Sequence, residues 1–172
     1  MKKLNRILCK LLFLLTFLSS LSSESFSDDI ISGIAKVIDG DTIYINNKKI
    51  RFSGIDAPES YFKGKSQICY SLASKEKIFC GNLSKEKLTD KIKDQIIDCF
   101  PENEDRYKRI IAECFLKQES LSTYMVRSGY AFDYIKYSKG KYQIDENFAK
   151  NNKLGLWETK FQYPWIWRKA NK

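Results

Sequence analysis

Short alternating runs of hydrophobic and polar residues dominate the chain between residues 33 and 56. Three such runs, Gly33–Gly40, Asp41–Asn47 and Lys49–Asp56, are rich in β-branched residues and are joined by the turn-forming sequences DGD and NNKK. Pro58 follows the third run and cannot continue it, because proline has no amide hydrogen to donate to a neighbouring strand. The pattern therefore predicts three consecutive strands connected by tight turns.

Later segments space their apolar side chains three or four residues apart, as amphipathic helices do. Helices are predicted at residues 83–95, 120–129 and 142–155. Ser120 is suited to cap the second of them at its N-terminus. Two further strand-like runs cover residues 96–100 and 109–116 and flank a polar loop, whereas residues 60–81 are predicted to be a polar loop with some helix.

Together these elements predict a mainly β or α+β fold with five strands and about three helices. A small closed barrel with helices packed on one side fits the order, because the first three strands are consecutive and the helices come later. An open α+β sheet fits the same pattern equally well. No repeat or low-complexity linker follows residue 30, so residues 28–172 are expected to form a single domain.

Residues 1–27 have the layout of a signal peptide. Basic residues precede the apolar run Leu11–Leu18, which is too short to span a bilayer, and the small residues Ser25 and Ser27 stand just before Asp28. Cleavage there would release an exported domain, either periplasmic or secreted. A membrane anchor formed by an uncleaved N-terminal segment is the alternative.

Four cysteines follow this segment: Cys69, Cys80, Cys99 and Cys114. An even number of cysteines in an exported chain predicts two disulfide bonds. The pairing of Cys69 with Cys80 and of Cys99 with Cys114 is favoured, since each bond closes a short loop. A zinc site built from all four thiolates is the alternative, although the chain has no C-x-x-C pair to support it.

The chain of 172 residues contains no histidine and has a formal net charge of +9. Residues 28–172 carry 26 basic and 20 acidic residues, and this excess of positive charge favours polyanionic partners such as nucleic acid or anionic lipid. The absence of histidine excludes a Ser-His-Asp triad, a histidine-based ribonuclease mechanism and a histidine-ligated zinc hydrolase. Carboxylates, lysine, tyrosine or water must therefore carry any acid–base chemistry.

Acidic residues gather around one arginine at the ends of the first predicted strands. Asp41 begins the second strand, Asp56 ends the third, and Glu59 follows within three residues. Carboxylates brought together repel each other unless a cation lies between them, and Ca²⁺ or Mg²⁺ suits such oxygen ligands. Arg51 precedes Asp56 by an odd number of positions, so both can face one site only if the strand bends, for which Gly54 is suited.

The ordered sequences VIDGDT, RFSGIDAPE and DRYKR resemble the motifs of the staphylococcal nuclease (thermonuclease) family, which are D-G-D-T, R-x-x-x-x-D-x-P-E and D-x-Y-x-R. MVRSGYA and NKLGLW resemble later elements of that family, so the likeness extends over residues 34–167. The resemblance implies an OB-type five-stranded β-barrel with about three helices. It also implies a Ca²⁺-dependent endonuclease that hydrolyses DNA and RNA and leaves 3′-phosphate ends, with no obligate protein partner.

The resemblance further implies a role for individual residues. Asp41, Asp56 and the backbone carbonyl of Ala57 are expected to bind one Ca²⁺ ion, with Asp39 ordering its waters. Glu59 is expected to be the general base that activates water. Arg51 and Arg109 are expected to hold the scissile phosphate, and Tyr107 to contact the bound nucleotide. A membrane is expected to be a partner only if the signal segment is retained.

The sequence departs from the family pattern at two places. Lys108 stands where glycine is usual, and the segment 60–81 carries two cysteines that well-known members lack. A catalytically weak or inactive nucleic-acid-binding module of the same fold is therefore the alternative function. The aromatic C-terminal tail, residues 157–168, is expected to pack against the domain rather than to stack on nucleic-acid bases.

Overall fold

The computed structural model describes residues 30–172. The predicted signal peptide, residues 1–27, lies outside the described residues and stays a prediction. No helix within residues 30–172 is both long and apolar enough to cross a membrane.

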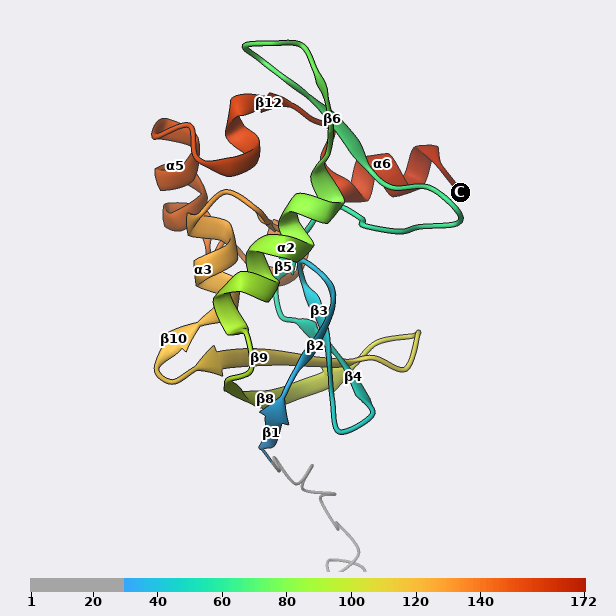
Figure 1. The fold of residues 1–172 in the computed structure, drawn as a ribbon. Coiled ribbons are helices and arrows are strands. Elements are labelled where there is room, and N and C mark those ends of the chain that lie inside the picture. The colour runs from blue at the N-terminus through green and yellow to red at the C-terminus, as the bar shows by residue number, and fades with distance from the viewer. Residues whose placement is uncertain (1–29) are drawn as a thin grey trace, which may run out of the picture.

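A curled mixed sheet, a half-barrel, forms one side of the molecule, with the helices gathered on the other side (Figure 1). Its strands lie in the order β1-β8-β9-β4-β3-β2, with β10 paired to β9. Their bounds are β1 Ile31–Ile34, β2 Lys36–Asp39, β3 Thr42–Ile45, β4 Lys48–Phe52, β8 Ile96–Glu104, β9 Ile110–Leu116 and β10 Glu119–Ser120. Only the β4–β9 pair among these is parallel. This arrangement confirms the predicted mainly β, OB-type fold, with two more strands in the sheet than the five expected.

The three predicted helices are present with shifted ends, and two short helices are added to them. Their bounds are α2 Cys80–Ile92, α3 Leu121–Arg127, α4 Ile135–Ser138, α5 Gln143–Asn151 and α6 Pro164–Ala170. Ser120 caps α3 as predicted, because its side chain accepts a hydrogen bond from the backbone N–H of Thr123. The helix α4 has only four residues, too few for a periodic pattern to reveal, and α6 lies in the aromatic tail, for which the sequence predicted packing but no helix.

Residues 60–67 are largely loop as predicted, whereas residues 68–79 form a β-hairpin that the sequence did not predict, and helix occurs only at Cys80 and Gly81, where α2 begins. Strands β6 (Ile68–Ser71) and β7 (Lys77–Phe79) pair with each other, and β12 (Thr159–Lys160) adds to β6. A disulfide between Cys69 and Cys80 ties this hairpin to the start of α2, and Cys99 bonds to Cys114 across β8 and β9. The favoured pairing is thus the one observed, and the thiolates are not available for a zinc site.

Two clusters of buried residues make up the core. The larger one lies between the sheet and the helices and includes the fully buried Ile43, Ile50 and Phe52. The smaller one surrounds Phe132 and the Cys69–Cys80 bond, and its aromatic residues come largely from the C-terminal tail. The packing role expected for this tail is confirmed, and one consequence is that the tail is held beside β5 (Ile55–Asp56), since β11 (Phe132–Asp133) pairs with that strand.

Candidate active site

Arg51 links Asp41 and Asp56, two of the acidic residues that the sequence indicated around it. Its Nη1 lies 2.9 Å from Oδ2 of Asp41, and its Nη2 lies 2.5 Å from Oδ1 of Asp56. The chain turns between β4 and β5 at Gly54, whose φ of 72° is readily adopted by glycine and rarely by other residues. This turn is the bend that the sequence required if Arg51 and Asp56 were to meet.

The two carboxylates beside Arg51 are almost fully withdrawn from solvent. Asp41 is 2% exposed and Asp56 is 0% exposed. Asp41 also accepts hydrogen bonds from the hydroxyl of Thr42 (2.8 Å) and from the backbone N–H of Ala57 (2.9 Å). The turn after β2 and the loop after β5 are therefore joined through one carboxylate, which fixes the positions of both.

A second arginine, Arg168 of helix α6, binds the same acidic group from the other end of the chain. Its Nη1 and Nη2 lie 3.0 and 2.6 Å from the two oxygens of Asp56, and Nη1 also lies 2.5 Å from Oε1 of Glu59. Sequence reasoning missed this residue, which it placed only in the aromatic tail. No local signal could have found it, because 112 residues separate it from Asp56.

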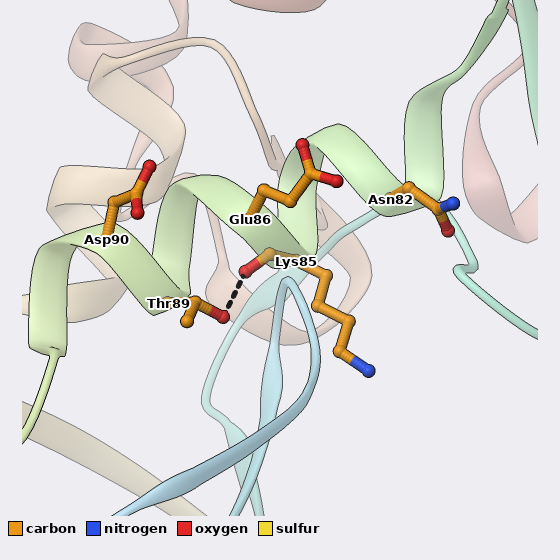
Figure 2. Close-up of a pocket in the computed structure, with 5 residues that line it drawn as sticks. All are labelled: Asn82, Lys85, Glu86, Thr89 and Asp90. Atoms are coloured by element: carbon orange, nitrogen blue, oxygen red, sulfur yellow. Dashed lines mark hydrogen bonds between the residues drawn. The ribbon is translucent and has the colours of Figure 1, made fainter.

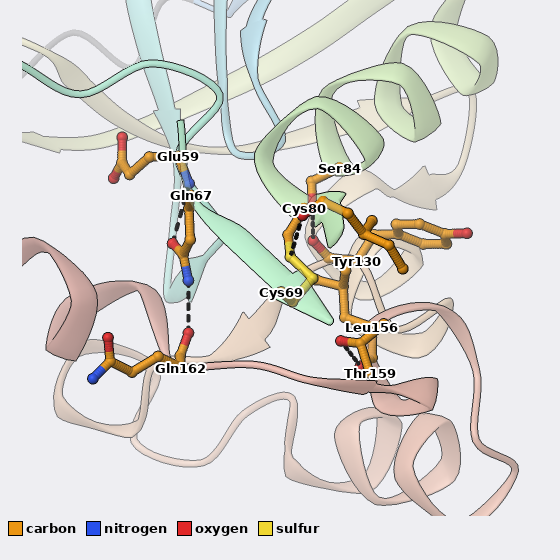
Figure 3. The surroundings of a disulfide bond; sticks show 10 residues. Glu59, Gln67, Cys69, Cys80, Ser84, Tyr130, Leu156, Thr159 and Gln162 are labelled. Carbon is orange, nitrogen blue, oxygen red and sulfur yellow. Dashed lines mark hydrogen bonds between the residues drawn. A yellow bond between two sulfur atoms is a disulfide. The ribbon is translucent and has the colours of Figure 1, made fainter. Parts of the chain in front are cut away.

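The backbone of Glu59 is held by a buried glutamine. Gln67 donates its backbone N–H to the carbonyl of Glu59 at 2.9 Å and receives the Glu59 N–H at its side-chain oxygen at 3.4 Å. The amide nitrogen of Gln67 donates to the carbonyl of Gln162 at 2.6 Å, as Figure 3 shows beside the Cys69–Cys80 bond. Gln67 therefore connects the loop that carries Glu59 to the segment that leads into α6.

Burial and mutual repulsion raise the pKa of two carboxyls around Arg51. Loss of solvent, followed by the charge of Asp41, raises the pKa of Glu59 to about 7, although Arg168 acts in the opposite direction. The same two causes raise the pKa of Asp39 to about 6, although the backbone N–H of Ser60 donates to it at 2.7 Å. A carboxyl with a pKa near neutrality is suited to accept a proton from water.

The net charge of this group favours the binding of a divalent cation. Four carboxyls, those of Asp39, Asp41, Asp56 and Glu59, and the guanidinium groups of Arg51 and Arg168 together carry two net negative charges when all are ionised, and the charge of Lys85 acts on Asp39 in addition. Within residues 30–172, no group of three or more His, Cys, Asp or Glu side chains is placed to hold a metal ion. A cation bound here would use carboxylate oxygens together with a backbone carbonyl, water or substrate, which suits a hard ion such as Ca²⁺.

Arg109 and Tyr107 lie in the turn between β8 and β9, and the structure does not bring them into contact with these carboxylates. Arg109 instead pairs with Asp105, with its Nε and Nη2 at 2.8 and 2.7 Å from Oδ2. The next residue, Ile110, pairs with Ile50 on the adjacent strand β4, one position from Arg51. The turn is thus anchored next to the strand of Arg51, and Tyr107 is exposed beside it.

Lys108 occupies a left-handed backbone position in this turn, with a φ of 62°. Because a side chain in that conformation costs about 1 kcal/mol, Lys108→Gly is expected to raise the free energy of unfolding by roughly 0.5–1 kcal/mol. Urea unfolding would measure the change. Lys108→Ala is the control, since it removes the same exposed contact with Glu104 but keeps the strained backbone. Equal stability of the two variants would contradict the expectation.

A surface hollow of about 560 Å³ is a separate feature on the outer side of α2. Figure 2 shows its lining residues, which are Asn82, Lys85, Glu86, Thr89 and Asp90. None of them belongs to the acidic group around Arg51. Lys85 alone is related to it, because its charge lowers the pKa of Asp39.

Comparison with known proteins gives a family match that covers most of the chain. The model of the family described as "Staphylococcal nuclease homologue" matches residues 49–159. The chain is 30% identical over 131 residues to a succinoglycan biosynthesis protein of Rhizobium meliloti, a match that covers 75% of this chain and 65% of that protein. It is 30% identical over 174 residues to a protein of Haemophilus influenzae described as an uncharacterized endonuclease, covering 96% and 86%.

The chain is also similar to a plant protein. A staphylococcal-like nuclease of Arabidopsis thaliana is 28% identical over 126 residues, a match that covers 72% of this chain but 34% of the plant protein. The segment that the family model matches includes Arg51, Asp56, Glu59 and Arg109, whereas Asp41 and Arg168 lie outside it.

Proposed function

The chain belongs to the staphylococcal nuclease family, and on this premise we propose that it is a Ca²⁺-dependent endonuclease that hydrolyses phosphodiester bonds of DNA and RNA. The observation that carries the proposal is the joining of Asp41, Asp56 and Glu59 around two guanidinium groups in a largely buried site. Such a group can polarise a phosphodiester, supply a base and stabilise negative charge without histidine.

Glu59 is the proposed general base. Its pKa of about 7 lets it accept a proton from the attacking water near neutral pH. Within residues 30–172, the hydrogen bond to its side chain is the one that Arg168 donates to Oε1. The other oxygen, Oε2, is then the atom that takes the proton, while the backbone contacts with Gln67 keep the carboxylate in place.

Arg51 and Arg109 are the proposed phosphate-binding residues. Attack on the phosphate builds negative charge on its oxygens, and a guanidinium can bind two of them with parallel hydrogen bonds. Arg51 is already held at the carboxylates. Arg109 would exchange its partner Asp105 for the substrate, and the phosphate would then take the place of this carboxylate at the guanidinium. Tyr107, exposed in the same turn, is the proposed contact to the nucleotide.

Asp41, Asp56 and the backbone carbonyl of Ala57 are the residues that would hold one Ca²⁺ ion. When bound, the ion supplies positive charge that polarises the phosphate and compensates the charge that develops during attack. The withdrawal of Asp41 and Asp56 from solvent and the excess of negative charge around them favour such binding.

The proposed location is an oxidising compartment outside the cytoplasm, periplasmic or extracellular. Two disulfide bonds within the described residues support it, since such bonds persist mainly in exported proteins. DNA and RNA are the proposed partners, and no obligate protein partner is part of the proposal. Contact with a membrane is proposed only for a chain that retains residues 1–27.

Removal of the metal tests the proposed function. Cleavage of single-stranded DNA by the purified protein is expected to require Ca²⁺ and to stop when a chelator is added, because Asp41 and Asp56 would then lack the cation that they are proposed to hold. Digestion with Ca²⁺, with Mg²⁺ and with chelator, followed by gel electrophoresis, measures this. A folded protein that binds DNA without cutting it in any of these buffers would contradict the proposal and support a binding module instead.

A further inference from the structure

The C-terminal helix α6 is fastened over the loop that carries Glu59. Phe62 packs edge-on against Trp167 with ring centroids 6.1 Å apart, and the Lys65 ammonium lies 3.3 Å from the side-chain oxygen of Asn171. The bond from Gln67 to the carbonyl of Gln162 adds a third connection just before the helix begins. Figure 1 shows α6 at the same end of the molecule as β6.

A stack of aromatic rings sets the position of the helix. Trp165 lies between Tyr163 and Tyr134, with ring centroids 4.6 and 4.8 Å apart and nearly parallel planes. Tyr163 in turn packs against the buried Phe132, whose strand pairs with the strand of Asp56. Packing rather than attraction between charges therefore brings Arg168, three residues after Trp165, to the acidic group.

Arg168 uses both of its terminal nitrogens on this group. Oδ2 of Asp56 lies 2.6 Å from one of them, Oδ1 of Asp56 lies 3.0 Å from the other, and that second nitrogen also binds Glu59. With Arg51 on Oδ1 as well, both oxygens of Asp56 are engaged by guanidinium groups. The side chain of Arg168 is 23% exposed, so it can move towards solvent without breaking the core.

We propose that Arg168 is a positioning residue of the active site, which holds Asp56 and Glu59 in place and competes with the divalent cation for the carboxylate of Asp56. The inference rests on the proposed function, since it assigns a residue to the same metal site. The residues matched by the family model end at Thr159, so Arg168 lies outside that match.

Competition follows from charge and from geometry. A cation that binds Asp56 needs at least one of its oxygens, and each oxygen is bonded to Arg168. A fixed positive charge at hydrogen-bond distance also repels a second cation. Two species that compete for one group weaken each other's binding by the same factor, so loss of Arg168 must tighten the binding of the cation.

Calorimetric titration with Ca²⁺ alone tests the inference on the purified protein. Arg168→Gln is expected to bind Ca²⁺ at least about fivefold more tightly than the wild type, the lower end of typical coupling between ligands. Its melting temperature in chelator is expected to fall, and Ca²⁺ is expected to raise it by more than in the wild type. At saturating Ca²⁺ its kcat is expected to be lower, because Glu59 has lost its partner.

Two further variants distinguish the effect of the charge of Arg168 from the effect of its geometry. Arg168→Lys keeps the charge but not the two-pronged geometry, so its Ca²⁺ affinity is expected to stay near that of the wild type while kcat falls. Lys169→Gln removes the same charge from the next residue of α6, where the side chain is exposed, and is expected to change neither value. A purely structural role of Arg168 would instead lower the melting temperature equally in chelator and in Ca²⁺.

Each remaining outcome is decisive. Unchanged or weaker Ca²⁺ binding by a folded Arg168→Gln variant would overturn the inference, and Ca²⁺-dependent cleavage by the wild type would still leave the proposed function standing. Absence of Ca²⁺ binding in both proteins would overturn both. If Arg168→Gln unfolds in chelator, its refolding by Ca²⁺ supports competition, and failure to fold at any Ca²⁺ concentration overturns it.

Discussion

Replacing Glu59 with glutamine is expected to lower the rate of phosphodiester cleavage by roughly 10²–10⁴-fold, the usual contribution of a general base. The amide keeps the size of the side chain and can still accept a hydrogen bond from Arg168, but it cannot take a proton from water. The protein should therefore stay folded and should still bind DNA. Initial rates of digestion at saturating Ca²⁺ would measure the loss, with circular dichroism to confirm the fold.

Glu86→Gln is the matched control for this substitution. Glu86 lies on the exposed side of α2, lines the surface hollow of Figure 2 and undergoes the same change of charge away from Arg51. Its rate is expected to equal that of the wild type. A Glu59→Gln variant that cleaves as fast as Glu86→Gln would show that another group accepts the proton and would remove Glu59 from the mechanism.

Replacing Gly81 with alanine is expected to destabilise the protein by about 2–3 kcal/mol and to abolish most of its activity. Gly81, in the first turn of α2, lies directly against the loop of Glu59. An added Cβ would stand 1.9 Å from the carbonyl oxygen of Glu59 and 2.4 Å from the backbone nitrogen of Ser60. Both are backbone atoms, so no side-chain rotation can relieve the clash, and the loop that carries the general base must move.

The direction of the stability change caused by Gly81→Ala tests the close approach of α2 to the loop of Glu59. Helix propensity alone predicts that alanine stabilises a helix by about 1 kcal/mol relative to glycine, which is the opposite direction. Urea unfolding would measure the free energy, and digestion assays well below the melting temperature would measure activity. Asn82→Ala, at the next and exposed position of the same helix turn, is the control and should retain both. A stabilised, active Gly81→Ala variant would contradict the close approach.

Local sequence determined much of the fold and part of the site. The meander from β2 to β4 and the helices α2, α3 and α5 follow from periodicity and turn residues that act over a few positions. The short loops closed by the two disulfides were likewise readable from spacing. The meeting of Arg51 with Asp41 and Asp56 also needed only local information, because a turn at Gly54 brings neighbouring strand ends together.

Local sequence did not predict the hairpin β6–β7 or the helix α6. The hairpin is held by the predicted disulfide to α2 and by pairing with β12, which lies some 90 residues later, and this second contact leaves no pattern within the segment. Helix α6 is seven residues long and depends on the stacking of Trp165 against Tyr134 and Tyr163. Such elements form because packing against distant segments of the chain stabilises them.

What the sequence by itself determined is therefore the chemistry available to this protein: carboxylates and arginines without histidine, placed in three ordered motifs. Tertiary structure decided which groups from distant segments meet. The contact of Arg168 with Asp56 and the approach of Gly81 to Glu59 depend on how distant segments close on each other. The physical reason is that long-range packing, not local preference, sets these distances, so no run of neighbouring residues encodes them.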